Sequence, residues 1–120
     1  MVTKTVPVNA ASIKQAIESH NGRMLTEFYA DKAVTKVIDQ NNPPGKPREI
    51  KGRAAIGAFW EDICGRAMTH RVDVTVAEDD RLVFTQACRY PDGAEVFAIS
   101  LLELADGLIV NQTMVQAWDE

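Results

Sequence analysis

The stretch from Glu95 to Trp118 reads EVFAISLLELADGLIVNQTMVQAW, with two apolar runs of strand length on either side of Asp106-Gly107. An Asp-Gly pair between two such runs is a strong signal for a β-hairpin. Successive side chains of a strand point to opposite faces, and in the first run both faces carry apolar residues. Ser100 and Glu103 are the polar residues that interrupt them. A strand that is apolar on both faces lies in the middle of a structure, so the rest of the chain is expected to cover it on two sides.

Upstream of this hairpin the apolar residues recur with a period of two. Residues 70–78 and 82–90 alternate in this way, and Asp79-Asp80 and Pro91-Asp92-Gly93 supply turns between the runs. The second half of the chain is therefore predicted to be a four-strand antiparallel meander.

The first half is predicted to be mainly helical. One helix opens at Ser12, with Gln15 completing a capping box, a second covers residues 23–29, and a third follows Gly52. Residues 33–39 read as a strand, which the Asn- and Pro-rich segment after it ends, and residues 46–51 read as a short edge strand. Helices segregated from an antiparallel sheet predict one α+β domain over residues 1–120.

Composition excludes several classes of function. The chain has 120 residues, a net charge of −4 and no basic run, which makes nucleic acid a poor partner. No apolar run is long enough to span a membrane, and the first residues lack the apolar segment of a signal peptide, so a cytoplasmic protein is expected. Cys64 and Cys88 are too few for a disulfide framework and are expected to be reduced. Without zinc spacing or a glycine-rich phosphate loop, no cofactor is expected.

The order of elements, and three local stretches, resemble a known family. FYADKAV leads into a strand, GRAAIGAFW opens the third helix and DGLIVNQTMVQAW ends the chain, as in the nuclear transport factor two-like fold. This family includes ketosteroid isomerases, SnoaL-like polyketide cyclases and limonene epoxide hydrolases. The resemblance implies a cone-shaped α+β fold, with three helices on a strongly curved, mixed, mainly antiparallel sheet. It also implies an apolar pocket between the two layers.

Matching the steroid isomerases residue by residue implies one catalytic candidate. Asp39 ends the strand after the second helix and takes the place of their general base. It would stand at the pocket rim, next to Trp118 and across from Ser100. The oxyanion donors are missing, because the first helix has no tyrosine and Ser100 replaces the second aspartate. The Asp-Arg-Asp arrangement of the epoxide hydrolases is also absent, since Gln86, Ser100 and Gln112 occupy the inward positions.

Seven residues are expected to contact a ligand, on alternation and on the family match. They are Trp60, Phe84, Gln86, Tyr90, Ser100, Met114 and Trp118. Other interpretations stay open, because aromatic and Met side chains at such spacings also build cores. Ser100 and Gln86 could bond each other or a water, and Asp39 could bond the amides of the following turn. His70 could be structural or an acid or base.

The sequence leaves three functions open. The first is a small-molecule pocket protein that works as a cofactor-free isomerase or cyclase, with Asp39 abstracting a proton alpha to a carbonyl of an apolar or polycyclic substrate. The second is a binding module for a small apolar ligand, and the third is a protein-interaction domain that uses the outer sheet face. A homodimer is expected through an outer apolar patch, because monomers rarely leave such a patch in water. The patch comprises Val83, Ala87, Phe97, Ile99, Leu101, Ile109 and Val115.

Overall fold

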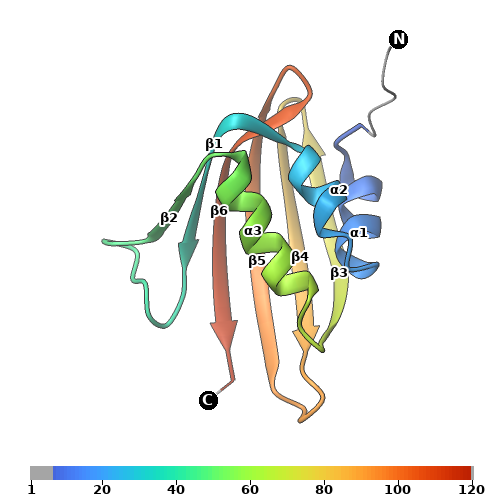
Figure 1. Ribbon diagram of the computed structural model, residues 1–120, viewed down its shortest axis with the longest axis vertical. Helices are drawn as coiled ribbons and strands as arrows, with labels where there is room; N and C mark the ends of the chain where they lie inside the picture. The colour runs from blue at the N-terminus through green and yellow to red at the C-terminus, as the bar shows by residue number, and fades with distance from the viewer. Residues whose placement is uncertain (1–6, 120) are drawn as a thin grey trace.

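The computed structural model describes residues 7–119, apart from the side chain of Val74. The elements follow in the order α1 (Ala10–Glu18), α2 (Gly22–Glu27), β1 (Tyr29–Ile38), β2 (Arg48–Lys51), α3 (Arg53–Cys64), β3 (Thr69–Glu78), β4 (Arg81–Arg89), β5 (Glu95–Ala105) and β6 (Leu108–Trp118). The three helices lie together on one side of a curved sheet (Figure 1). In the described residues, no helix is long and apolar enough to cross a membrane.

The strands form one six-stranded sheet in the order β2-β1-β6-β5-β4-β3. β1 runs parallel to β6, and the other neighbouring strands pair antiparallel. β1 and β6 are neighbours in the sheet although β2, α3 and β3–β5 lie between them in the chain. β6, the last strand of the meander, returns to lie parallel to β1. The α+β fold with a mixed, mainly antiparallel sheet is therefore confirmed.

β5 lies in the sheet interior and has two different faces. One row of side chains faces the helices and is buried: Val96, Ala98, Ser100 and Leu102. The opposite row is exposed to water in the single chain: Phe97 by 47%, Ile99 by 43% and Leu101 by 40%. The helices thus supply one of the two covers that the sequence predicts for this strand.

The expectation that Ile109 lies on the outer face is wrong, because β6 contains a β-bulge. Glu103 pairs with Asn111 and Leu104 pairs with Ile109, which leaves Val110 as an extra residue. One extra residue reverses the alternation of faces, so Ile109 points into the core and is 2% exposed. Beyond the bulge the expected alternation holds, with Met114 buried and Val115 exposed.

The ends of the first elements differ from those expected. Asn9, rather than Ser12, is the N-cap of α1, and the capping box joins these two residues instead of Ser12 and Gln15. The Ser12 amide donates to Asn9 Oδ1 at 2.8 Å, and the Asn9 amide donates to Ser12 Oγ at 3.0 Å. α2 stops at Glu27 and β1 begins at Tyr29, four residues before the predicted strand.

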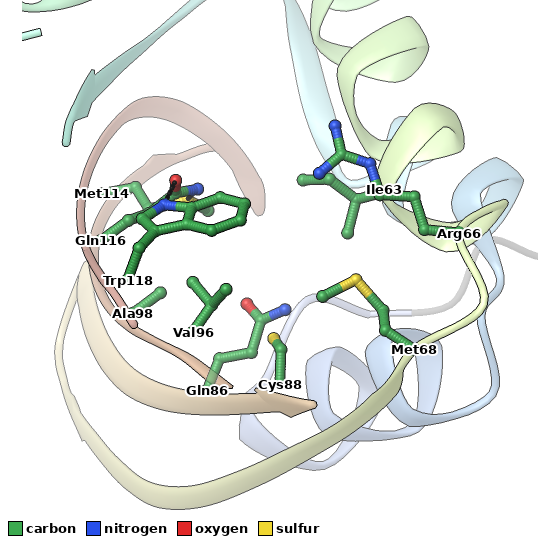
Figure 2. A pocket seen from close by; sticks show the side chains of 10 residues that line it. All are labelled: Ile63, Arg66, Met68, Gln86, Cys88, Val96, Ala98, Met114, Gln116 and Trp118. Carbon is green, nitrogen blue, oxygen red and sulfur yellow. Dashed lines mark hydrogen bonds between the residues drawn. The ribbon is translucent and has the colours of Figure 1, made fainter. Parts of the chain in front are cut away.

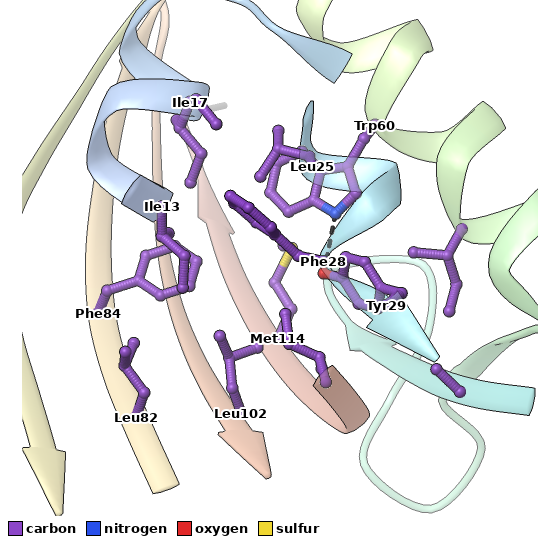
Figure 3. Packing of buried hydrophobic residues seen from close by; sticks show 14 of the residues in the cluster. Ile13, Ile17, Leu25, Phe28, Tyr29, Trp60, Leu82, Phe84, Leu102 and Met114 are labelled. Atoms are coloured by element: carbon purple, nitrogen blue, oxygen red, sulfur yellow. Dashed lines mark hydrogen bonds between the residues drawn. The ribbon is translucent and has the colours of Figure 1, made fainter. Parts of the chain in front are cut away.

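The main core fills the space between the helices and β1, β4, β5 and β6. Figure 3 shows Ile13 and Ile17 of α1 over Phe84, and Trp60 of α3 beside Tyr29. A second, smaller cluster consists of Met68, Cys88 and Val96 with the half-buried rings of Tyr90 and Trp118 packed on it. This cluster lies where α3 has ended and the helical cover gives way to a loop.

Candidate functional site

A pocket with a cavity volume of about 30 Å³ lies at the second cluster, between the end of α3 and the sheet (Figure 2). Its lining residues are Ile63, Arg66, Met68, Gln86, Cys88, Val96, Ala98, Met114, Gln116 and Trp118. A water-sized cavity needs at least about 10–15 Å³, whereas a cavity that holds benzene measures about 150 Å³. The pocket as it stands therefore accepts a very small group, and a ring requires its flexible walls to move.

Strand register explains why the sheet residues meet at this place. Gln86 pairs with Ala98 and Cys88 pairs with Val96, so these four inward side chains form two adjacent rows. Val96 in turn pairs with Trp118 on β6. The opposite wall comes from the C-terminal turn of α3, through Ile63, and from the loop that follows it.

Of the residues predicted to bind a ligand, Gln86, Met114 and Trp118 line this pocket. Trp60, Phe84 and Ser100 are fully buried, and the structure places both aromatic residues in the main core. Tyr90 lies beside the pocket, with its ring stacked on Trp118 at a centroid distance of 6.2 Å. Ligand contact by all seven residues stays a prediction.

A buried hydrogen-bond network occupies the polar groups of the main core. Trp60 Nε1 donates to Tyr29 Oη at 2.9 Å, and Tyr29 Oη donates to Gln112 Oε1. Thr35 Oγ1 also donates to Gln112 Oε1 at 3.1 Å, and Gln112 Nε2 donates to Ser100 Oγ at 3.1 Å. Burial raises the pKa of the Tyr29 phenol, which therefore stays neutral. These groups satisfy one another, as buried polar groups must.

Sequence reasoning missed Tyr29 and Thr35 in this network. Tyr29 fell inside a predicted helix, although it precedes a period-two run that starts with buried Ala33 and Thr35. Gln112 was the available signal, because a glutamine at an inward strand position needs several partners. The network also bonds Ser100 to Gln112 and not to Gln86.

A second polar cluster adjoins the pocket: Gln86 and Cys88 line it, and His70 lies against both of them. His70 Nδ1 is 3.0 Å from Cys88 Sγ and 3.3 Å from Gln86 Nε2. All three residues are buried, with Gln86 exposed by 3% and His70 by 8%. Burial lowers the pKa of His70 to about 4, helped by the positive charge that His20 can carry, and burial raises the pKa of the Cys88 thiol to about 11. The two groups therefore meet as neutral imidazole and neutral thiol at pH 7, not as a nucleophilic ion pair.

Two atoms of this cluster have no hydrogen-bond partner among the described residues: His70 Nε2 and Gln86 Oε1. The other glutamine of the pocket is different. Gln116 accepts from Trp118 Nε1 at 3.1 Å and donates to Met114 Sδ at 3.2 Å, so both ends of its amide are engaged.

Asp39 lies directly after β1 and is half-buried. Its Oδ1 accepts hydrogen bonds from the Asn41 amide and from Asn42 Nδ2, each at 2.9 Å. The register between β1 and β6 pairs Ile38 with Val115, which brings the end of β1 to the same end of the sheet as the pocket. The carboxylate, however, is held by the following loop and is not among the lining residues of the pocket.

Arg66 is the charged residue at the mouth of the pocket. Its Nη2 donates to Asp62 Oδ2 at 2.6 Å and its Nη1 donates to Tyr90 Oη at 3.0 Å. The guanidinium is thus balanced by a carboxylate one helical turn away. In the described part of the chain, no group of three or more His, Cys, Asp or Glu residues converges to hold a metal ion.

The arrangement of three helices over a curved mixed sheet defines a nuclear transport factor 2-like fold, and a structure search finds this fold in solved proteins. A Mesorhizobium loti protein of unknown function superimposes with a TM-score of 0.75 at 20% identity, over 90% of this chain and 85% of that one. A Kribbella flavida protein, provisionally named a ketosteroid isomerase, matches with a TM-score of 0.73 at 17% identity, over 92% and 75% of the two chains. A computationally designed 17-OHP binder matches with a TM-score of 0.65 at 23% identity, over 88% and 87%.

Residues 10–112 match the family model of the SnoaL-like domain, so the chain belongs to the SnoaL-like family. A comparison with curated protein sequences found no match. At these identities the structural likenesses show the fold and do not carry an activity over to this chain.

Proposed function

We propose that this protein binds a small, mainly apolar molecule in the pocket between the end of α3 and β4–β6. One observation carries the proposal: the pocket combines apolar walls with a buried amide oxygen, on Gln86, that has no partner among the described residues. Apolar walls with a few convergent polar groups are typical of ligand sites.

The chemistry of the walls favours binding over turnover. The titratable side chains that line the pocket are Arg66 and Cys88, and no carboxylate or imidazole is among the lining residues. Ser100, which takes the place of an oxyanion donor in the isomerase match, is fully buried and is not among the lining residues, so its hydroxyl does not face the pocket. Loss of such a donor typically costs a factor of about 10² to 10³ in rate.

A pocket-filling variant tests the proposal. Ala98→Val adds two methyl groups at a buried lining position, with a side chain that suits a strand. We expect it to abolish retention of a small molecule that native mass spectrometry detects on freshly purified wild-type protein. Ala58→Val, on the exposed side of α3, is the matched control and should retain the molecule. Equal retention by both variants would place the ligand elsewhere and contradict the proposal.

Cofactor-free proton transfer by Asp39 is the second candidate, favoured by its position at the same end of the sheet as the pocket. To act, its carboxylate would have to leave Asn41 and Asn42 and turn towards a bound ketone. Asp39→Asn keeps the shape and removes the base. It should abolish proton exchange at an activated carbon of that ketone and leave binding intact, whereas retained exchange would eliminate this candidate.

The site of action in this proposal is the cytoplasm, and the active form is a homodimer joined through the outer sheet face. The cytoplasmic assignment is supported by two free cysteines, Cys64 and Cys88, among the described residues. The dimer is supported by the exposed row of Phe97, Ile99 and Leu101. Because a two-fold dimer uses the same patch on both subunits, this row on an interior strand can pack on its own copy. A different protein partner is the alternative occupant.

A further inference from the structure

Among the described residues, the buried side-chain amide of Gln86 has a partner at one end only. Nε2 lies against His70 Nδ1, whereas Oε1 has no partner among the described residues, and only 3% of Gln86 is exposed. Figure 2 shows this amide pointing into the pocket between Val96 and Met68. A buried acceptor that has lost its hydrogen bonds to water and gained no donor is unfavourable, so a ligand group that donates to it removes that penalty.

His70 and Cys88 determine which end of the amide faces the pocket. Nδ1 of His70 lies 3.0 Å from Cys88 Sγ and 3.3 Å from Gln86 Nε2, and in the tautomer that carries its proton on Nε2 it can accept from the Gln86 NH₂ group. The amide nitrogen is thereby held in the wall and the amide oxygen is left for the pocket. The walls thus present a hydrogen-bond acceptor to a ligand.

The remaining walls favour a planar ring. Met68, Cys88 and Met114 bring three sulfur atoms to the pocket, and Trp118 brings an aromatic face. Sulfur next to an aromatic ring contributes a favourable contact, and methionine side chains adapt easily to a new shape. Arg66 is already paired with Asp62, which reduces any attraction for an anion.

We infer that the ligand is a small aromatic molecule with one hydrogen-bond donor, an O–H or N–H group, which donates to Gln86 Oε1. His70 is a positioning residue that orients this amide. The inference rests on the proposed binding function and specifies the class of ligand.

Two matched pairs of probes test it: phenol against toluene for an O–H donor, and indole against benzofuran for an N–H donor. Calorimetry gives the affinities, and NMR shifts of the Ala98 and Trp118 amides report whether a probe occupies the pocket. For wild-type protein we expect the donor of at least one pair to bind about tenfold more tightly than its partner. The pair that shows this difference in affinity identifies the donor as O–H or N–H.

Variants assign this preference to the amide. Gln86→Met keeps the length of the side chain and should make the members of each pair bind equally. Gln15→Met, at an exposed glutamine of α1 outside the pocket, is the matched control and should keep the tenfold ratio. His70→Phe should reduce the ratio of the affinities of the donor probe and its matched partner. If His70 were purely structural, the substitution would instead weaken the binding of both probes by the same factor.

The outcomes separate the two proposals. If probes occupy the pocket but no donor is preferred, the role of Gln86 is overturned and the binding function stands. Tighter binding of benzaldehyde than of phenol would show that the amide presents its N–H group, which also overturns the inference. If no probe shifts the pocket amides, the proposed binding site itself is wrong.

Discussion

At the scale of single residues, two buried groups carry measurable signatures. His70 is one, because its buried imidazole is neutral at pH 7. It lies next to Cys88 and Gln86 of β4, and its ring centroid is 4.9 Å from that of His20. Tyr29 is the other, because its hydroxyl joins Trp60 to Gln112. Each predicts the effect of one substitution.

His70 should make stability depend on pH. Its pKa falls from the ordinary histidine value of 6.5 to about 4 in the folded chain, so between these values the unfolded chain binds more protons. The free energy of unfolding should therefore rise by about 1–3 kcal/mol between about pH 4 and about pH 6.5. Above about pH 6.5 the contribution of His70 should stay level. Urea unfolding at pH 4.5 and 7 measures this. His70→Phe should flatten the profile, and an unchanged pH slope in that variant would contradict the assignment.

Tyr29→Phe should destabilise the protein by about 1–3 kcal/mol, because it removes the hydroxyl between two buried groups and leaves Trp60 Nε1 without its acceptor. Chemical denaturation measures the change. Tyr90→Phe is the control, since its hydroxyl accepts from exposed Arg66, and it should cost less than about 1 kcal/mol. Equal costs would show that the network contributes no special stability.

At the scale of elements, the close approach of α2 and α3 depends on Gly57. A Cβ at this position would lie 2.7 Å from both Cγ2 and Oγ1 of Thr26, and the Thr26 hydroxyl is held by a hydrogen bond of 2.7 Å to the Gly22 carbonyl. The position of α3 sets the pocket, because Ile63 on its last turn forms part of the wall. The glycine is therefore needed for packing, despite its low helix propensity.

Gly57→Ala should consequently destabilise the chain, although alanine in a helix is normally favoured by about 1 kcal/mol. We expect a net loss of about 1–3 kcal/mol, as for overpacking of a core. Adding Thr26→Ala removes the clashing atoms and should restore most of the loss. Thermal unfolding of the two single variants and the double variant tests this; a stabilised Gly57→Ala variant would refute the close packing.

At the scale of the whole molecule, the proposed homodimer depends on the outer sheet face. Ile99→Glu places a carboxylate in the centre of the exposed apolar row and should convert the proposed dimer into a monomer or insoluble protein. Val76→Glu is the control, because Val76 is 58% exposed on the edge strand β3, outside this row. Size-exclusion chromatography with light scattering distinguishes the forms. A monomer for both wild type and Ile99→Glu would refute the dimer.

Much of the fold could be predicted because it depends on local patterns. The alternation in residues 70–90 and 95–118 predicts a meander, and the apolar spacing after Gly52 predicts α3. The bulge at Val110 could not be predicted, because an extra residue leaves no local signature in an apolar run. That single residue moves Ile109 from the outer face to the core.

The sequence by itself determined which side chains of β4, and of β6 beyond its bulge, face inward, and Gln86, Met114 and Trp118 of the pocket are among them. Only the tertiary structure decided which inward groups satisfy one another. It joins Tyr29 to Gln112, 83 residues apart, and brings His70 to Gln86 across two strands. Periodicity fixes the face of an element, because side-chain direction is a local property of the backbone. Partnership between buried polar groups depends on strand register, bulges and the position at which α3 ends, and these are settled only when the layers pack.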